Sequence, residues 1–227
     1  MKIKFLGHSC FFIEANGKNI IIDPFVSPNP QAAHLNINDI KVDYILLTHG
    51  HEDHIADVEN VLKNNPQAMI VSNYEIVVHY AKKGFDKGHP MNVGGSKEFD
   101  FGKVKMVNAI HSSSFPDGSY AGVPAGFVIE SEGKAIYHAG DTALCEDMKQ
   151  LASSHQLDLS MLPIGDNFTM GLDDALLASD YIGCDKFVGM HYNTFPPIEI
   201  DLEKTKETAL KAGKDLVLLG IGEFINL

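Results

Sequence analysis

Arginine is absent from the sequence, and all 18 basic residues are lysines. With 30 acidic residues, the formal net charge is −12 at pH 7. Arginine is the residue that proteins favour for binding phosphate and carboxylate groups, because its guanidinium group forms two parallel hydrogen bonds with them. Proteins that wrap DNA also need a basic surface. The composition therefore argues against a DNA-wrapping role, although it leaves open a phosphodiester substrate that is held by metal ions.

Cysteine and long apolar segments are also scarce. Cys10, Cys145 and Cys184 are an odd, scattered set without C-x-x-C spacing, which favours a reducing compartment. No apolar run approaches the ~18 residues of a membrane-spanning helix. Gly7 and His8 interrupt the N-terminal segment, so that it lacks the apolar core of a signal peptide. We therefore expect a globular, cytoplasmic protein that has no contact with a membrane.

The 227 residues are predicted to form one domain, residues 1–227, because no linker or low-complexity segment divides them. Alternating apolar residues and turn signals predict strands, and apolar residues at helical spacing predict helices. The expected strands are 2–6, 10–15, 19–22, 43–47, 68–72, 97–101, 104–110, 126–131, 134–138, 158–162, 186–190 and 216–219. The expected helices are 55–63, 74–83, 146–153, 172–181 and 202–212, and residues 25–41 are expected to form a surface loop.

A weak internal repeat indicates how these elements pack. Residues 17–23 resemble residues 133–141, because each segment has Gly-Lys-x-Ile followed by an aspartate. In each half of the chain, hairpins come first and alternating strands and helices follow. Two such halves packed face to face give two sheets with helices outside, which is an α/β fold with the four layers αββα.

Histidine is abundant, with 11 residues. Residues 48–54 read Thr-His-Gly-His-Glu-Asp-His and directly follow a predicted buried strand. An extended backbone turns the rings of His49 and His51 to one side, and Asp53 and His54 follow as the chain enters a helix. These four donors cannot all reach one small ion without strain, but they can serve two adjacent ions. A polar helix start capped by Asp53 does not explain three histidines at this spacing, so we predict metal binding here.

This pattern resembles the H-x-H-x-D-H signature of the metallo-β-lactamase-fold hydrolases, and the resemblance covers the whole chain. Asp23, His111, Asp141 and His191 each follow a predicted strand and look like the further motifs of that superfamily. Residues 7–10, Gly-His-Ser-Cys, and the short chain resemble a small group of uncharacterised metal-dependent hydrolases within it. Relatives of that group include ascorbate-6-phosphate lactonase and N-acyl-phosphatidylethanolamine phospholipase D.

The resemblance implies two divalent ions held by seven side chains, with His49, His51 and His111 on one ion, Asp53, His54 and His191 on the other, and Asp141 between them. Histidine and carboxylate ligands suit zinc, manganese or iron. No cysteine falls in a ligand motif, which argues against β-lactam hydrolysis. Flavodiiron relatives have a glutamate in place of one signature histidine, whereas His51 and His54 are both present here, which favours hydrolysis over redox chemistry.

The resemblance also implies that the nucleophile is water. Two ions a few Å apart bind a hydroxide between them at neutral pH and polarise the carbonyl or phosphoryl oxygen of the substrate. Asp53 would then both ligate an ion and orient the water. Asp23 would accept a hydrogen bond from a ligand histidine and so fix its tautomer.

Three more residues are candidates for contact with the substrate. His8 ends the first predicted strand, and it is either a strand end without a further role or a residue that contacts the substrate or transfers a proton. Asn167 either donates to a substrate oxygen or forms a turn. Tyr192 directly follows a predicted ligand, and it either lines the pocket or only packs.

The sequence leaves open a phosphodiester or a lactone or other acyl substrate. Nucleic-acid-processing relatives have an additional domain, and the segment between Asp141 and His191 contains no long insertion that resembles it. The acidic composition favours a small molecule or a short nucleic-acid end as the substrate. The competing functions are a redox-active diiron protein and a non-catalytic metal-binding module. A homo-oligomer is compatible with the sequence, which does not define the oligomeric state.

Overall fold

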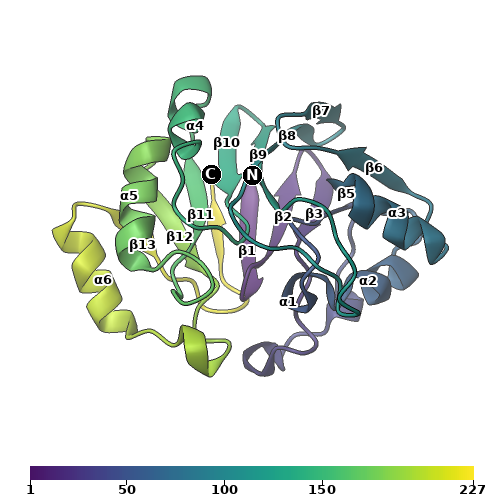
Figure 1. Ribbon diagram of the computed structural model, residues 1–227, viewed down its shortest axis with the longest axis horizontal. Helices are drawn as coiled ribbons and strands as arrows, with labels where there is room; N and C mark the ends of the chain where they lie inside the picture. Colours follow the sequence, from purple (N-terminus) through teal and green to yellow (C-terminus); the bar gives the residue numbers. More distant parts are fainter.

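Two seven-stranded β-sheets lie face to face in the middle of the molecule, and helices cover their outer faces (Figure 1). The computed structural model describes residues 1–227. The helices outside the first sheet are α1 (Glu52–Ile55), α2 (Val58–Asn64) and α3 (Tyr74–Lys82), and those outside the second are α4 (Met148–Ser154), α5 (Leu172–Ile182) and α6 (Leu202–Lys211). This confirms the predicted four-layer αββα sandwich.

The strands of the two sheets follow the same plan. The first sheet consists, in spatial order, of β14 (Phe224–Asn226), β1 (Lys2–Gly7), β2 (Cys10–Ala15), β3 (Lys18–Ile22), β4 (Tyr44–Leu46), β5 (Met69–Asn73) and β6 (Gly88–Met91). The second consists of β7 (Ser96–Phe99), β8 (Gly102–Asn108), β9 (Ala125–Ser131), β10 (Lys134–His138), β11 (Leu159–Pro163), β12 (Lys186–Met190) and β13 (Asp215–Val217). In each sheet, three antiparallel pairs are followed by three parallel pairs.

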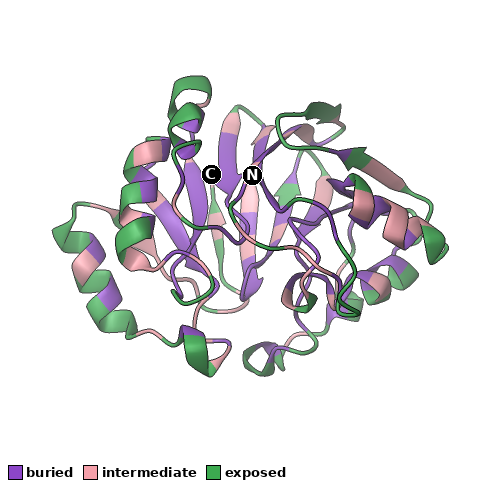
Figure 2. Cartoon of the chain, in the orientation of Figure 1, coloured by how far each residue is buried: buried purple, intermediate pink, exposed green.

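The inner faces of both sheets form the larger hydrophobic core. Phe11 of the first sheet and Phe127 of the second belong to this core and are fully buried. A second core lies between the first sheet and helices α2 and α3, and it contains Ile45, Val61 and Ile76. Buried residues accordingly fill the strands in the middle of Figure 2, while the outer faces of the helices are exposed. The burial of apolar area on both faces of the sheets is the main force that stabilises this arrangement.

The predicted helix 55–63 is instead two helices, α1 and α2. The break occurs at Asp57, whose buried carboxylate accepts hydrogen bonds from the backbone N–H groups of Val26 and Ser27 at 2.7 and 2.8 Å. These bonds hold the preceding loop against the helix pair. Within the predicted loop, residues 30–32 and 37–39 form single 3₁₀ turns.

The carboxyl ends of the parallel strands from both sheets meet at one edge of the sandwich. The backbone N–H of His191, after β12, donates to the carbonyl oxygen of His8, after β1, at 2.9 Å. Nearby, the imidazole of His138 lies 3.0 Å from the carbonyl oxygen of Ser9. These bonds between the sheets bring together side chains that are far apart in the sequence.

Candidate metal centre

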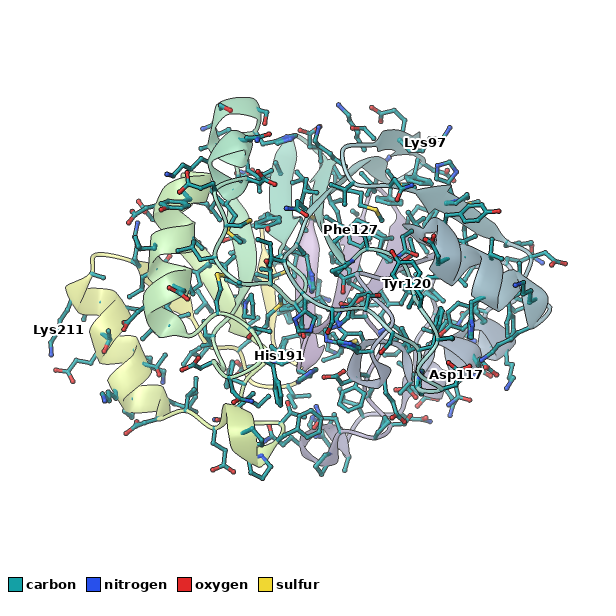
Figure 3. The ribbon with its side chains drawn as sticks, in the orientation of Figure 1. Lys97, Asp117, Tyr120, Phe127, His191 and Lys211 are labelled. Carbon is teal, nitrogen blue, oxygen red and sulfur yellow. The ribbon has the colours of Figure 1, made fainter.

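Eight donor side chains lie at this edge, and His191 marks their position in the central part of Figure 3. They are the seven predicted ligands and His8. The donor atoms of His49, His51 and His111 lie within 4.8 Å of one another, and a second group with the same spacing contains His8, Asp53, His54 and His191. The structure therefore brings the predicted donors together and places His8, which the sequence-based ligand set omitted, inside the second group.

Asp141 lies between the two groups. Its Oδ2 is 3.5 Å from Nε2 of His111 and 4.0 Å from Nε2 of His49, both in the first group. The same oxygen is 3.0 Å from Nε2 of His191, and Oδ1 is 3.3 Å from Nε2 of His54, both in the second group. One buried carboxylate thus faces both groups of imidazoles.

Several buried donor atoms have no hydrogen-bond partner within the protein. Nε2 of His54 and Oδ1 of Asp141 are both buried and form no hydrogen bond, although they are 3.3 Å apart. Such unpaired atoms are rare in folded proteins. Nε2 of His49 and Nδ1 of His51 lie 3.0 Å apart, close to the roughly 3.4 Å that separates two imidazole nitrogens on one tetrahedral zinc ion. The donors therefore fit bound divalent metal ions.

The position of the first group depends on a close approach of two loops. The N–H of Gly50, between His49 and His51, donates to Oγ of Ser113 at 3.2 Å. A Cβ atom at this position would lie 2.3 Å from Cβ of Ala121. Only glycine therefore lets the loop of Ser113 and Ala121 pack against the end of β4.

Three site residues have strained backbones. His8, Asp23 and His191 each lie at or directly after the end of a strand, and their φ angles are 56°, 46° and 55°. This left-handed region is unfavourable for residues with a Cβ atom, and such strain persists where the surrounding structure enforces it, often at functional sites. The sharp turns direct all three side chains to the same edge of the sheets.

The carboxylate of Asp23 fixes the tautomers of two donor histidines. It accepts hydrogen bonds from Nδ1 of His54 at 2.8 Å and from the hydroxyl of Thr48 at 2.6 Å. Because that hydroxyl donates to Asp23, it accepts from Nδ1 of His49, which is 3.0 Å away. In their neutral forms both imidazoles therefore carry the proton on Nδ1 and present Nε2 to the cluster, as a metal ligand requires. Asp23 lies where the sequence predicts, whereas the role of Thr48 was not predicted.

Replacing Thr48 by valine should lower metal affinity by about 10- to 100-fold, the usual cost of losing a residue that orients a ligand. Valine keeps the shape of the side chain but leaves Nδ1 of His49 without its acceptor. Competition with a chelator of known affinity measures the change.

The matched control for this substitution is Thr205→Val, because Thr205 is a buried threonine on α6, a helix that carries no donor of the cluster. Its metal affinity should equal that of the unmodified protein. Chelator competition that gives the same affinity for Thr48→Val as for the control would contradict the relay through the hydroxyl.

Electrostatics differ between the two donor groups. Burial lowers the pKa of His49 well below its usual value and also lowers the pKa of His111, and the neutral imidazole is the form that binds metal. Burial also opposes the charged form of His54, but the carboxylates of Asp141, Asp23 and Asp53 outweigh it and hold the pKa of His54 well above its usual value. This concentration of negative charge favours a cation in the second group.

His8 contacts both a predicted ligand and a neighbouring loop. Its Nε2 is 3.0 Å from Oδ2 of Asp53, and its Nδ1 is 2.9 Å from Oγ1 of Thr194. The ring centroid lies 4.2 Å from that of His191. Burial lowers the pKa of His8 to about 4. The imidazole therefore connects Thr194 to Asp53 instead of ending a strand without further contacts.

The two predicted substrate contacts occupy different environments. Asn167 is exposed, with a φ angle of 56°, and its side chain forms no hydrogen bond within the protein. Tyr192 is half-buried and packs partly against the larger core, and burial raises its pKa to about 12. Asn167 is thus free to contact a ligand, whereas Tyr192 also has a packing role.

His138 is a further residue whose contacts the sequence did not predict. The N–H of Gly140 donates to its Nδ1 at 3.2 Å, so Nε2 carries the proton and donates to the carbonyl oxygen of Ser9 at 3.0 Å. This buried imidazole links Ser9, which follows His8, to Gly140, which precedes Asp141. It thereby holds the second sheet against the turn that carries His8.

Comparisons with known proteins agree with the fold and the donor set. Residues 18–192 match the beta-lactamase superfamily domain. A "UPF0173 metal-dependent hydrolase" from Flavobacterium johnsoniae is 60% identical over 227 residues, which cover 100% of both chains. Another from Bacillus cereus is 47% identical over 230 residues, covering 96% of this chain and all of the relative. Among solved structures, a metallo hydrolase from the archaeon Ignicoccus hospitalis has a TM-score of 0.88 at 36% identity, covering 99% of this chain and 97% of that one.

The fold and the cluster of histidines and aspartates together define a metal-dependent hydrolase of the metallo-β-lactamase superfamily. Within it, the chain belongs to the UPF0173 metal-dependent hydrolase family. The resemblance to this superfamily and to a group of small metal-dependent hydrolases is confirmed, while the link to ascorbate-6-phosphate lactonase stays a prediction. None of the helices has the length and apolar character needed to cross a membrane.

Proposed function

We propose that the protein is a dinuclear hydrolase that cleaves its substrate with an activated water molecule. His49, His51 and His111 would hold one divalent ion, Asp53, His54 and His191 would hold the other, and Asp141 would serve both. The observation that carries this proposal is the position of Asp141, whose carboxylate faces Nε2 atoms of both groups at 3.0 to 4.0 Å. When bound, such a pair of ions supplies a strong nucleophile from water and polarises the oxygen of the reacting bond.

In this proposal, Asp53 and His8 transfer the proton that the attacking water releases. The side chain of Asp53 is 27% exposed, unlike the fully buried imidazole of His8, so it is open to the attacking water. Its Oδ2 lies 3.0 Å from Nε2 of His8. A proton taken up by Asp53 can therefore be shared with the imidazole and then pass back through the exposed carboxylate of Asp53 to the leaving group.

The donor set suits zinc, manganese or iron, because it combines imidazole and carboxylate without thiolate. The substrate is a small molecule or a short nucleic-acid end that presents a phosphodiester or a lactone or other acyl bond. Asn167 and Tyr192 contact it at the edge of the site. All three cysteines are buried and unpaired, which supports action in a reducing compartment, the cytoplasm.

Protein purified without chelators should contain two equivalents of metal per chain by elemental analysis. Removal of the metal should stop turnover of a panel of phosphodiesters, lactones and thioesters, and restoring it should return the activity. A constant single equivalent that Asp53→Ala does not change would contradict the dinuclear site. Two equivalents of iron with consumption of oxygen, and no hydrolysis, would support the redox alternative instead.

A further inference from the structure

A second cavity, of about 750 Å³, lies at the end of the sandwich opposite the donor cluster. Lys134 lines this cavity and begins β10, whereas Asp141 follows the other end of the same strand. Glu98 of β7 is also part of the wall, and its neighbour Lys97 lies in the upper part of Figure 3, away from His191. None of the eight donor residues lines the cavity, which is therefore separate from the metal centre.

The cavity forms where equivalent hairpins of the two halves of the chain meet. Asn16 lies in the turn between β2 and β3, and Glu132 in the turn between β9 and β10, with φ angles of 48° and 55°. The backbone N–H of Asn16 donates to Oε1 of Glu132 at 2.7 Å, and its Nδ2 donates to the carbonyl oxygen of Asp100 at 2.7 Å. Oε2 of Glu132 is 2.6 Å from the amino group of Met1. These bonds join the two sheets and fix one wall of the cavity.

His155 also lines the cavity, with a side chain that is only 8% exposed. Its Nδ1 lies 2.8 Å from Oε1 of Glu130 and donates to it, because a carboxylate only accepts hydrogen bonds. Nε2 of the neutral imidazole is then an acceptor, and it is buried without a hydrogen-bond partner. Since buried polar atoms almost always have a partner, this atom indicates a ligand that donates a hydrogen bond.

One carboxylate in the wall of the cavity has no cationic partner. Lys134 pairs with Asp158 at 2.8 Å, and Nζ of Lys103 lies 3.9 Å from Glu130. Glu98 stands opposite Lys103 in the β7–β8 pair, yet its exposed side chain forms no ion pair. None of the groups of side chains that could hold a metal ion lies at this end of the molecule. The cavity therefore fits an organic cation better than a metal ion.

We propose that this cavity binds a small organic diamine. One ammonium group pairs with the carboxylate of Glu98, and the group at the other end of the molecule donates to Nε2 of His155. An ammonium group carries N–H donors and no acceptor, so it complements both of these acceptors. The site is distinct from the metal centre, and its ligand does not depend on the proposed hydrolase function.

Titration calorimetry with putrescine tests this inference on the metal-loaded protein. Putrescine should bind with a stoichiometry of one per chain. Butanediol lacks the charge, and the fully N-methylated derivative of putrescine lacks the N–H donors. Both compounds should bind about tenfold more weakly than putrescine or worse, because hydrogen bonds that involve a charged group are the stronger ones.

Two substitutions in the wall locate the binding site. His155→Phe keeps a ring but removes the acceptor, and it should weaken putrescine binding by about tenfold. Glu98→Gln removes one exposed charge and should weaken binding by about threefold. The matched control is Glu203→Gln, because Glu203 is a carboxylate on α6 that is 87% exposed and lies outside the cavity. The control should bind putrescine as the unmodified protein does.

Three results would overturn the diamine site. They are the absence of putrescine binding, binding of butanediol as tight as that of putrescine, and equal putrescine affinity in Glu98→Gln and Glu203→Gln. The last comparison decides the matter even if His155→Phe does not fold. Putrescine should also bind the metal-free protein with unchanged affinity. Binding that requires the metal would place the amine at the metal centre and would likewise contradict the proposal.

Discussion

Replacing Asp141 by alanine is expected to reduce metal content below one ion per chain and to lower turnover by more than ~100-fold, beyond the effect of losing a residue that only supports a ligand. Oxygens of Asp141 lie 3.0 Å from Nε2 of His191 and 3.5 Å from Nε2 of His111. Its loss therefore removes a donor from both groups at once. Elemental analysis and steady-state kinetics on the same preparation measure both effects.

Asp158→Asn is the matched control for Asp141→Ala, because Asp158 is a carboxylate at the opposite end of β11, where it binds Lys134. This variant should keep its metal and its turnover. If Asp141→Ala retains two ions, the carboxylate does not link the two groups. The dinuclear proposal would then lose its main support.

His8→Ala is expected to lower turnover by about 10²-fold, the lower end for a group that transfers protons, and to leave metal content unchanged. The reason is that the imidazole contacts Asp53 and Thr194 by hydrogen bonds and would share the proton of Asp53 in the proposed reaction. Steady-state kinetics and elemental analysis of the variant check both parts of this expectation.

The comparison variant for His8→Ala is His111→Ala, which removes a proposed metal ligand, so that metal content and turnover should fall together. If His8→Ala also loses an ion, His8 is a ligand, as its place in the second donor group would then explain. Full turnover of His8→Ala with both ions present would show that the residue has no part in the reaction.

The sequence predicted the αββα fold and every donor of the cluster except His8, from the spacing of residues 48–54 and from the resemblance to the superfamily. The segment 48–54 carries four donors at close spacing, and Asp23, Asp141 and His191 each follow a strand or come within three residues of its end. Parallel strands place such residues at one sheet edge regardless of loop details. A resemblance in strand order and ligand spacing was therefore sufficient to identify the superfamily.

Contacts between distant segments could not be predicted in the same way. The bond between His8 and Asp53 joins residues 45 positions apart, and the break at Asp57 depends on N–H groups about 30 positions earlier. Strands β6 and β14 were not predicted, because Gly88–Met91 contains glycine and proline and Phe224–Asn226 is only three residues long. Their pairing depends on neighbouring strands and not on their own propensity.

The identical plan of the two sheets has a consequence for how the site arose. Asp23 and Asp141 follow the equivalent strands β3 and β10, and His8 and His111 follow the equivalent strands β1 and β8. Duplication of one ancestral unit would produce such pairs with initially identical roles. The two aspartates nevertheless have different roles in the present protein, since Asp141 faces the donor groups while Asp23 holds the imidazole of His54 in place. The centre is therefore asymmetric although the two sheets share one plan, and neither half of the chain supplies a complete set of donors by itself.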